Sequence, residues 1–493
     1  MSIPRVARHS PRAGDPPGAF EYAGRRLRVL IDAPRQRRSS GDRDMVGDRV
    51  EMPSDLVSFC WGLASRDDVE LLWVNEPDEP LTVGSVVIDE QPSADFLQFR
   101  VWSEGGRTVG RAVSLYSQWE EFAERDAPDV GLPQDRWLDQ ILVARVAVEL
   151  RCDVFITTRG ETLGYDGRYI TEANPMAPQD ALFVLGLYLR SRNRDCPIVA
   201  PAQLVMPPSD MFRIAVDAIM PSGRPWAAAL YKLRWENDIE EPSRLVNAFR
   251  ERLSWVLRYR DRLHIALLAP HDNDTAENVR ADLSNLLYNL VGAFDAAARV
   301  AHLCAGNLPK DQRKAGWQNP TWLKSLNNTA LSDLFGNSSR GSDVFAACRN
   351  LRNTIHGEGL SSTALQEQSA PLQTMVRIPD SEVAALTALL DRLDGPISWG
   401  LRTIPGAGTL IDTAPFIERL VPEALAVLDE AIRLTPTEQL TGVDPATVVG
   451  RPFDASEQAT HHRIALLLGL GAATEVHPAP AAASTAAVGA ASH

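Results

Sequence analysis

The sequence predicts an α/β N-terminal domain, with a parallel sheet flanked by helices, followed by an all-α helical bundle domain. Before about residue 205, short apolar runs typical of strands alternate with longer helical patterns, which indicates a parallel sheet covered on both faces. After that point apolar residues recur at helical spacing, and no convincing strand is found. The segment Met206-Pro207-Pro208 marks the boundary.

The first predicted strand is the apolar run 27–31, which ends at Asp32. Further strands are predicted at 69–74, 83–88, 96–102, 153–157 and 197–199. The helical patterns between them cover 56–64, 114–124, 137–150 and 180–190. Together they form an α/β domain over residues 25–205, and an Arg-, Pro- and Gly-rich arm at 1–24 is expected to be disordered.

The clearest helix of the second half covers 278–303, where leucines recur at i, i+3 and i+4. Other helices are predicted at 244–258, 331–335, 344–355, 383–393, 416–434 and 462–468. We divide this half into a helical domain over 206–400 and C-terminal helices over 401–471. The tail at 472–493 is a low-complexity sequence that is expected to be disordered.

The composition sets limits on the function. The chain has 493 residues, of which 44% are apolar and 23% charged, as in ordinary globular proteins. A net charge of -14 excludes a general nucleic-acid coating protein, because an acidic surface repels phosphate. Any nucleic-acid site must therefore be a local basic patch. The arginines of residues 25–49 reflect either genomic base composition or an arm that contacts phosphate.

The five cysteines are far apart and form no CxxC pair. We therefore expect neither a structural zinc site nor a disulfide framework. The sequence has no N-terminal apolar segment typical of a signal peptide and no apolar run long enough to cross a membrane. These features predict a cytoplasmic protein that does not bind a membrane.

Two acidic residues lie at positions defined by the predicted strands and helices of the first half. Asp32 follows the first strand, at the edge where open parallel sheets bind ligands. Asp139 lies in the first turn of a helix that leads into a strand ending in Thr157-Thr158-Arg159. This layout over residues 26–200 resembles PIN-like nuclease domains. The resemblance implies that Asp32 and Asp139 hold Mg²⁺ or Mn²⁺, which activates a water for phosphodiester attack.

The match departs from the family pattern at two acids. The acid expected two residues after the threonine is missing, and Glu161 lies one position further on. The acid expected in the middle of the domain has no clear counterpart. The alternative is that both acids are structural. Asp32 would then cap the turn after its strand, and Asp139 would stabilise its helix by interacting with the positive end of the helix dipole.

The strongest local signal is the segment 348–359, CRNLRNTIHGEG. Arg349, Arg352, Asn353 and His356 are spaced so that they share one face of a helix, which ends near Gly357. Two cations, an amide and an imidazole are unsuited to a core and well suited to binding an anion.

This segment resembles the Arg-Asn…His motif of HEPN domains, which are helical modules of toxins and defence ribonucleases. The resemblance covers about residues 240–400 and includes the segments 289–299 and 317–323. Six residues separate Arg349 from His356, which fits the family spacing, whereas the three between Arg352 and His356 are one too few. The family implies RNA cleavage without a metal or other cofactor, and a homodimer formed through the helical domain.

In that chemistry, His356 would take the proton of a 2′-hydroxyl or give one to the leaving oxygen. Arg349 and Arg352 would stabilise the charge on phosphorus. Asn353 would orient the imidazole or hold a phosphate oxygen. The alternative is a buried polar network that closes the helix end against Asp295 or Glu358.

Asp295, Arg299 and His302 share one face of the predicted helix over 278–303. This face either forms a salt bridge or adds an acid to the site.

We therefore predict an RNA-cleaving or RNA-binding protein of toxin or antiviral defence type, an endoribonuclease if it is an enzyme. The alternatives are a metal-dependent nuclease at the N-terminal domain and a non-enzymatic sensor or scaffold that binds a protein partner. A buried, fully hydrogen-bonded His356 would indicate the scaffold.

Overall fold

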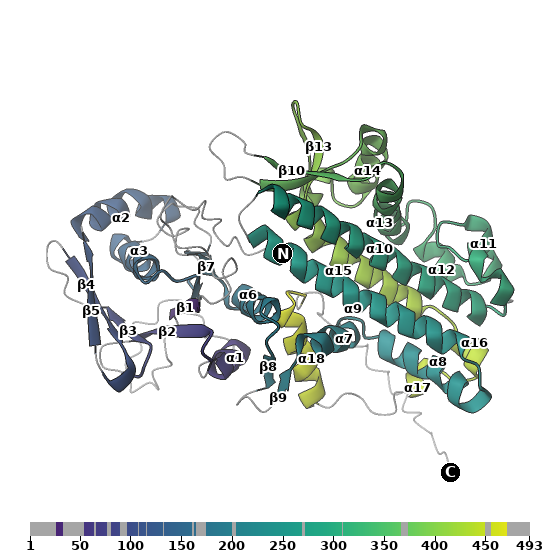
Figure 1. The fold of residues 1–493 in the computed structure, drawn as a ribbon, viewed down its shortest axis with the longest axis horizontal. Coiled ribbons are helices and arrows are strands. Elements are labelled where there is room, and N and C mark those ends of the chain that lie inside the picture. Colours follow the sequence, from purple (N-terminus) through teal and green to yellow (C-terminus); the bar gives the residue numbers. More distant parts are fainter. Residues whose placement is uncertain are drawn as a thin grey trace, which may run out of the picture.

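The computed structural model describes residues 26–32, 54–63, 66–75, 80–88, 96–106, 108–114, 116–131, 133–159, 162–163, 174–199, 204–268, 272–307, 309–365, 373–448 and 455–470. The predicted arm at 1–24, most of the arginine-rich stretch at 25–49 and the tail at 472–493 lie outside these residues. The fold class is confirmed, because a seven-stranded sheet flanked by helices is followed by a predominantly helical region (Figure 1).

The main sheet is built outward from a central strand. β1 (Leu27–Asp32) pairs in parallel with β2 (Val69–Asn75) on one side and with β6 (Val154–Thr157) on the other. The chain fills one side of β1 first and then returns to its other side, so the ligand-binding switch point of the sheet lies between β1 and β6. The strand order is β5-β4-β3-β2-β1-β6-β7, with β3 (Ser85–Ile88), β4 (Phe96–Trp102), β5 (Thr108–Ser114) and β7 (Pro175–Met176).

Alternate side chains of the central strands enter two different cores, as the period of a strand requires. Val29 and Ile31 join the core beneath α1 and α6, whereas Leu30 and Phe155 join the core beneath α2 and α3. Burial on both faces explains why these strands are continuous apolar runs. The helices are α1 (Ser54–Leu63), α2 (Tyr116–Val130), α3 (Gln134–Glu149) and α6 (Pro178–Ser191).

The sheet is mixed rather than purely parallel. β3 pairs with β4, and β4 with β5, in antiparallel register. The strand predicted at 197–199 exists as β8 (Cys196–Val199), but it pairs with β9 (Leu204–Met206) in a separate hairpin. Local sequence indicates a strand without indicating its partner, which depends on the tertiary fold.

Two long antiparallel helices, α9 and α10, run through the centre of the helical region (Figure 1). None of the helices among the described residues has both the length and the apolar character needed to cross a membrane. The helices of this region are α7 (Pro208–Ile219), α8 (Gly223–Asn237), α9 (Glu241–Leu268), α10 (Asn273–Cys304), α11 (Pro320–Ser325), α12 (Thr329–Leu334), α13 (Arg340–Gly357), α14 (Asp380–Arg392), α15 (Thr413–Arg433), α16 (Thr437–Thr441), α17 (Pro445–Val448) and α18 (Ala455–Leu467).

A second, smaller sheet interrupts the helical region, so the description of this region as all-α holds for most but not all of it. The strands are short, and β10 is built of Ser, Thr and Ala with a single Leu, so neither length nor apolar content predicts them. Their antiparallel order is β10-β11-β13-β12, with β10 (Ser361–Leu365), β11 (Gln373–Arg377), β12 (Leu401–Ile404) and β13 (Gly408–Asp412).

Buried arginines join the two halves of the chain. Arg190 on α6 forms a bidentate ion pair with Asp261 on α9, with Nη2 3.1 Å from Oδ1, and its Nη1 donates to the carbonyl of Leu467 at 2.8 Å. Beside it, Arg260 Nη2 donates to Glu418 Oε1 on α15 at 2.8 Å. A single apolar core runs from β1 through α6 to α15 and α18, so packing is continuous across the predicted boundary near residue 206.

The pair between Arg190 and Asp261 yields a stability prediction. Asp261→Leu leaves the arginine buried without its carboxylate, so we expect the free energy of unfolding in urea to fall by about 3–5 kcal/mol. The double variant Arg190→Leu/Asp261→Leu removes both charges and should recover much of this loss. Glu430→Leu, which breaks an exposed pair with Arg433, is the control and should cost at most about 1 kcal/mol. A double variant no more stable than Asp261→Leu would contradict the prediction.

The same network makes stability depend on pH. Burial opposes ionisation of Glu418, but Arg260 and His264, whose Nε2 lies 2.7 Å from Oε1, outweigh it and lower the pKa of Glu418 to about 2. The ordinary value is 4.5, so the carboxylate stabilises the fold above pH 4.5, and this contribution is lost as the pH falls toward 2. The free energy of unfolding in urea should be higher for wild type than for Glu418→Gln at neutral pH. This difference should decrease as the pH falls below 4.5, by roughly 3 kcal/mol in total. A difference that stays constant with pH would contradict this.

Candidate functional site

The helix that carries the Arg-Asn…His segment, α13, has well-defined ends. The Ser339 hydroxyl accepts a backbone N–H of the first turn at 3.1 Å, and Gly359, with a φ of 79°, follows the last turn. Near its start, Asp343 accepts two hydrogen bonds from Arg392 of α14, at 2.8 and 2.5 Å. The inner side of the helix is apolar and buried: Val344, Phe345, Ala347, Cys348 and Leu351.

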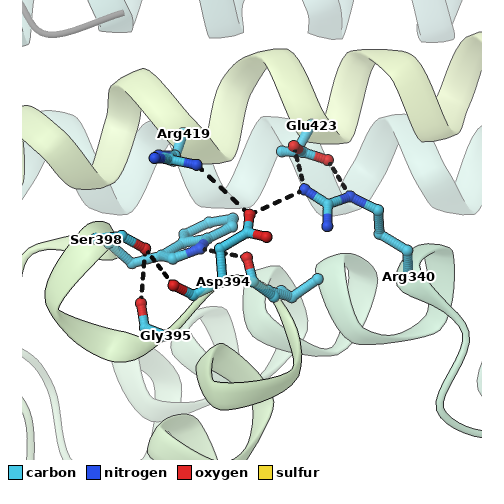
Figure 2. Close-up of polar contacts among 8 residues, drawn as sticks. Arg340, Asp394, Gly395, Ser398, Arg419 and Glu423 are labelled. Atoms are coloured by element: carbon cyan, nitrogen blue, oxygen red, sulfur yellow. Dashed lines mark hydrogen bonds and ion pairs between the residues drawn. The ribbon is translucent and has the colours of Figure 1, made fainter.

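Further ion pairs hold the first turn of α13 against α15 (Figure 2). Arg340 donates to both carboxylate oxygens of Glu423, at 2.8 and 2.5 Å, and its Nη2 lies 3.3 Å from Asp394 Oδ2. Arg419 Nη1 reaches the same Asp394 oxygen at 3.5 Å. Asp394 has a φ of 109°, a strained conformation for a residue with a Cβ, and its ion pairs help to maintain it. The N-terminal half of α13 is therefore firmly positioned.

The outer face of α13 is open to solvent at its C-terminal end. Arg349 and Arg352 are half-buried, whereas Asn353 and His356 are exposed. The His356 imidazole forms no hydrogen bond with any part of the chain that the structure describes. The four residues grouped by the sequence thus lie on one accessible helix face and do not form a buried network. Glu358, the suggested partner for closing the helix end, instead accepts a hydrogen bond from Ser381 at 3.2 Å.

Three helices bring arginines around a single carboxylate. Arg252 of α9, Arg299 of α10 and Arg352 of α13 all lie close enough to Asp295 of α10 to act on its charge. Within the described ranges, none of these three guanidinium groups forms a hydrogen bond or an ion pair. Arg349 lies about one turn before Arg352 on α13; its Nη2 donates to Asn350 Oδ1 at 3.5 Å, and its buried Nε has no hydrogen-bond partner within the described residues. Together the four arginines form what we call the arginine patch. Their charge exceeds that of Asp295, so the patch is a local basic site.

Helical spacing in the sequence singled out Asp295 and Arg299 as candidate site residues. It did not single out Arg252, because α9 carries no motif. Burial raises the pKa of Asp295, and the three nearby guanidinium groups oppose this without overcoming it. His302, grouped with them by helical spacing, is not part of the patch. It is buried, and its Nδ1 accepts a hydrogen bond from Trp322 Nε1 at 3.1 Å.

Asp32 and Asp139 do converge at the carboxyl edge of the main sheet, with a guanidinium between them. Arg159, which follows β6, donates from Nε to Asp32 Oδ2 at 2.7 Å and from Nη1 to Asp139 Oδ2 at 2.6 Å. Thr157 Oγ1 donates to the same Asp32 oxygen at 3.2 Å. Asp32 is buried, whereas 55% of the Asp139 side chain is exposed. The sequence predicted both acids but not this arginine as their partner.

These residues do not fit a Mg²⁺ or Mn²⁺ site as they are arranged. Burial opposes the charge of Arg159, but Asp32 and Asp139 raise its pKa, so the guanidinium stays charged between them. Across the described part of the chain, no group of three or more His, Cys, Asp or Glu is placed to hold a metal ion. Glu161 lies outside the described residues. Metal-dependent cleavage at this edge stays a prediction.

Comparison of the chain with protein-family models, with curated proteins and with solved structures gives no match. The PIN-like and HEPN resemblances therefore stay predictions based on local sequence. The function has to be inferred from the chemistry of the two clusters, which are the guanidinium between acids at the sheet edge and the unpaired guanidinium groups beside α13.

Arg159 yields a prediction that separates an ion pair from a metal site. Arg159→Met leaves the buried Asp32 carboxylate without a cation, and we expect this to lower the free energy of unfolding by about 3 kcal/mol. Millimolar Mg²⁺ should then raise the melting temperature of this variant more than that of wild type, because two carboxylates are released. The control is Arg213→Met, at an exposed pair with Asp210, which should change neither quantity appreciably. A variant as stable as wild type would contradict this role of Arg159.

Proposed function

We propose that the chain binds RNA on the outer face of α13 and cleaves it without a metal ion, with His356 as the group that transfers the proton. The observation that carries this proposal is the arginine patch. Three of its four arginines come from three different helices, surround Asp295 and form no hydrogen bond or ion pair within the described residues, and the patch lies beside the helix that carries an exposed imidazole. Guanidinium binds phosphate through paired hydrogen bonds. Because the chain has a net charge of -14, a polyanion would be attracted only to such a local patch.

The reaction would be a transfer within the RNA strand. His356 would take the proton of a 2′-hydroxyl, and the 2′ oxygen would attack the adjacent phosphorus. The bond to the 5′ oxygen would break, which leaves a 2′,3′-cyclic phosphate and a 5′-hydroxyl end. The departing oxygen needs a proton, which a second imidazole would supply in the homodimer that the HEPN resemblance implies.

The arginines and the amide would assist this transfer. Arg349 and Arg352 would stabilise the negative charge that develops on the phosphorane oxygens. Asn353 is exposed one turn before His356, so its amide would orient the imidazole or hold a phosphate oxygen. A metal-independent ribonuclease of this kind fits the toxin or antiviral defence role that the resemblance implies.

The exposure of His356 favours this function over the two alternatives. A scaffold would have buried and hydrogen-bonded the imidazole, which is instead exposed and, within the described residues, without a hydrogen bond. A nuclease at the sheet edge would need Asp32 and Asp139, which both bind Arg159.

The central prediction is that His356→Ala reduces RNA cleavage by at least roughly 100-fold, because general acid–base catalysis contributes about that much or more. Arg352→Gln should cost roughly 100-fold through loss of charge stabilisation. Cleavage of an end-labelled RNA, followed on gels, should be the same with and without EDTA. The matched control is His462→Ala, which removes an exposed histidine of α18 and should leave cleavage unchanged.

Three results would count against the proposal. Wild type that cleaves no RNA would contradict it, and so would a His356→Ala variant that retains full activity. Activity that is lost with EDTA and in Asp32→Asn would assign the reaction to the N-terminal domain instead.

A further inference from the structure

Two exposed aromatic rings lie beside arginines on α9 and α10. Trp255 of α9 is 40% exposed and Tyr288 of α10 is 53% exposed, although both belong to helices that are otherwise well packed. The guanidinium carbon of Arg258 lies 4.9 Å from the Trp255 ring centre, and that of Arg252 lies 5.7 Å from the Tyr288 ring centre. Each ring therefore has a cation beside it, and the Trp255 ring centre also lies 5.8 Å from that of Tyr259. The rest of each ring is exposed to solvent to the extent given above.

Arg252 connects these rings to the arginine patch. It lies three residues before Trp255, which is about one turn of α9, and its guanidinium approaches both Tyr288 and Asp295. It crosses α10 at Gly292, where an added Cβ would lie 2.6 Å from the guanidinium carbon. Trp255 and Tyr288 thus both neighbour Arg252, which shares Asp295 with Arg352. Arg352 lies about one turn before His356 on α13.

Rings and cations in this combination suit one kind of nucleic acid. A single strand exposes the faces of its bases, which stack on aromatic side chains, while its phosphates bind guanidinium groups. A duplex keeps its base faces inside the helix, so exposed rings would add nothing to its binding. Charge alone would attract either form, and the rings are the feature that discriminates between them.

We propose that Trp255 and Tyr288 are stacking platforms for the bases of single-stranded RNA, whose phosphates lie on Arg252, Arg299 and Arg352 on the way to His356. This inference rests on the proposed function, and it specifies the substrate class. It also assigns to Gly292 the role of leaving space for Arg252 across α10.

The test is the binding of a short, end-labelled single-stranded RNA, measured by fluorescence anisotropy in the His356→Ala background so that the strand stays intact. Trp255→Leu and Tyr288→Leu should each weaken binding by roughly 10-fold, because one stacked base is lost. Tyr288→Phe keeps the ring and should bind nearly as the background does. Trp235→Leu, at an exposed tryptophan of α8, is the matched control and should have no effect.

Two further ligands separate stacking from charge. An RNA of the same length without bases should bind the background more weakly and should be insensitive to the leucine substitutions. A duplex should be equally insensitive to them. Gly292→Ala displaces the Arg252 guanidinium and should weaken binding of all three ligands, with a smaller salt dependence.

The outcomes distinguish this inference from the proposed function. If wild type cleaves RNA but both leucine variants bind as well as the background, or if the duplex binds more tightly than the single strand, the inference is wrong and the proposed function stands. If the aromatic rings are needed for binding but wild type cleaves nothing, the platforms stand and the proposed cleavage is wrong. If no RNA binds even at low salt, both are overturned.

Discussion

The buried ion pair between Arg190 and Asp261 is the contact on which the placement of the candidate RNA surface depends. An unpartnered charge in a core costs several kcal/mol, so α9 must present Asp261 to α6 and Arg260 to Glu418 at the same time. Only a narrow range of rotations of α9 about its axis satisfies both. In that range the opposite side of the helix, with Trp255, is turned toward solvent.

Arginine has two different roles in this chain, and the difference separates the two clusters. At the edge of the main sheet, Arg159 lies between Asp32 and Asp139 and forms an ion pair with each of them. Beside α13, three arginines surround Asp295 alone, so the local charge is positive. The first arrangement stabilises a fold, whereas the second is suited to an external anion.

The α13 helix is anchored at one end and open at the other. Arg340 and Asp343 tie its first turn to α15 and α14 through bidentate ion pairs, and its apolar side packs on α10. Its last turns carry Asn353 and His356 into solvent. A side chain at the open end of a rigid helix is accessible yet well positioned, which is the combination that proton transfer to a bound strand requires.

Local periodicity was enough to predict several features of this chain. Apolar runs predict β1 to β4 and β6 of the main sheet but not β5 or β7. The leucine spacing predicts α10, and helical spacing alone places Arg349, Arg352 and His356 on one face. Three features became visible only in the folded chain: Arg252 of α9 lies near Asp295 together with Arg352, Arg159 binds both predicted acids, and the four short strands β10 to β13 pair with one another. These contacts join segments that are far apart in the chain, so they depend on how helices and strands pack and not on the residue pattern within any one of them.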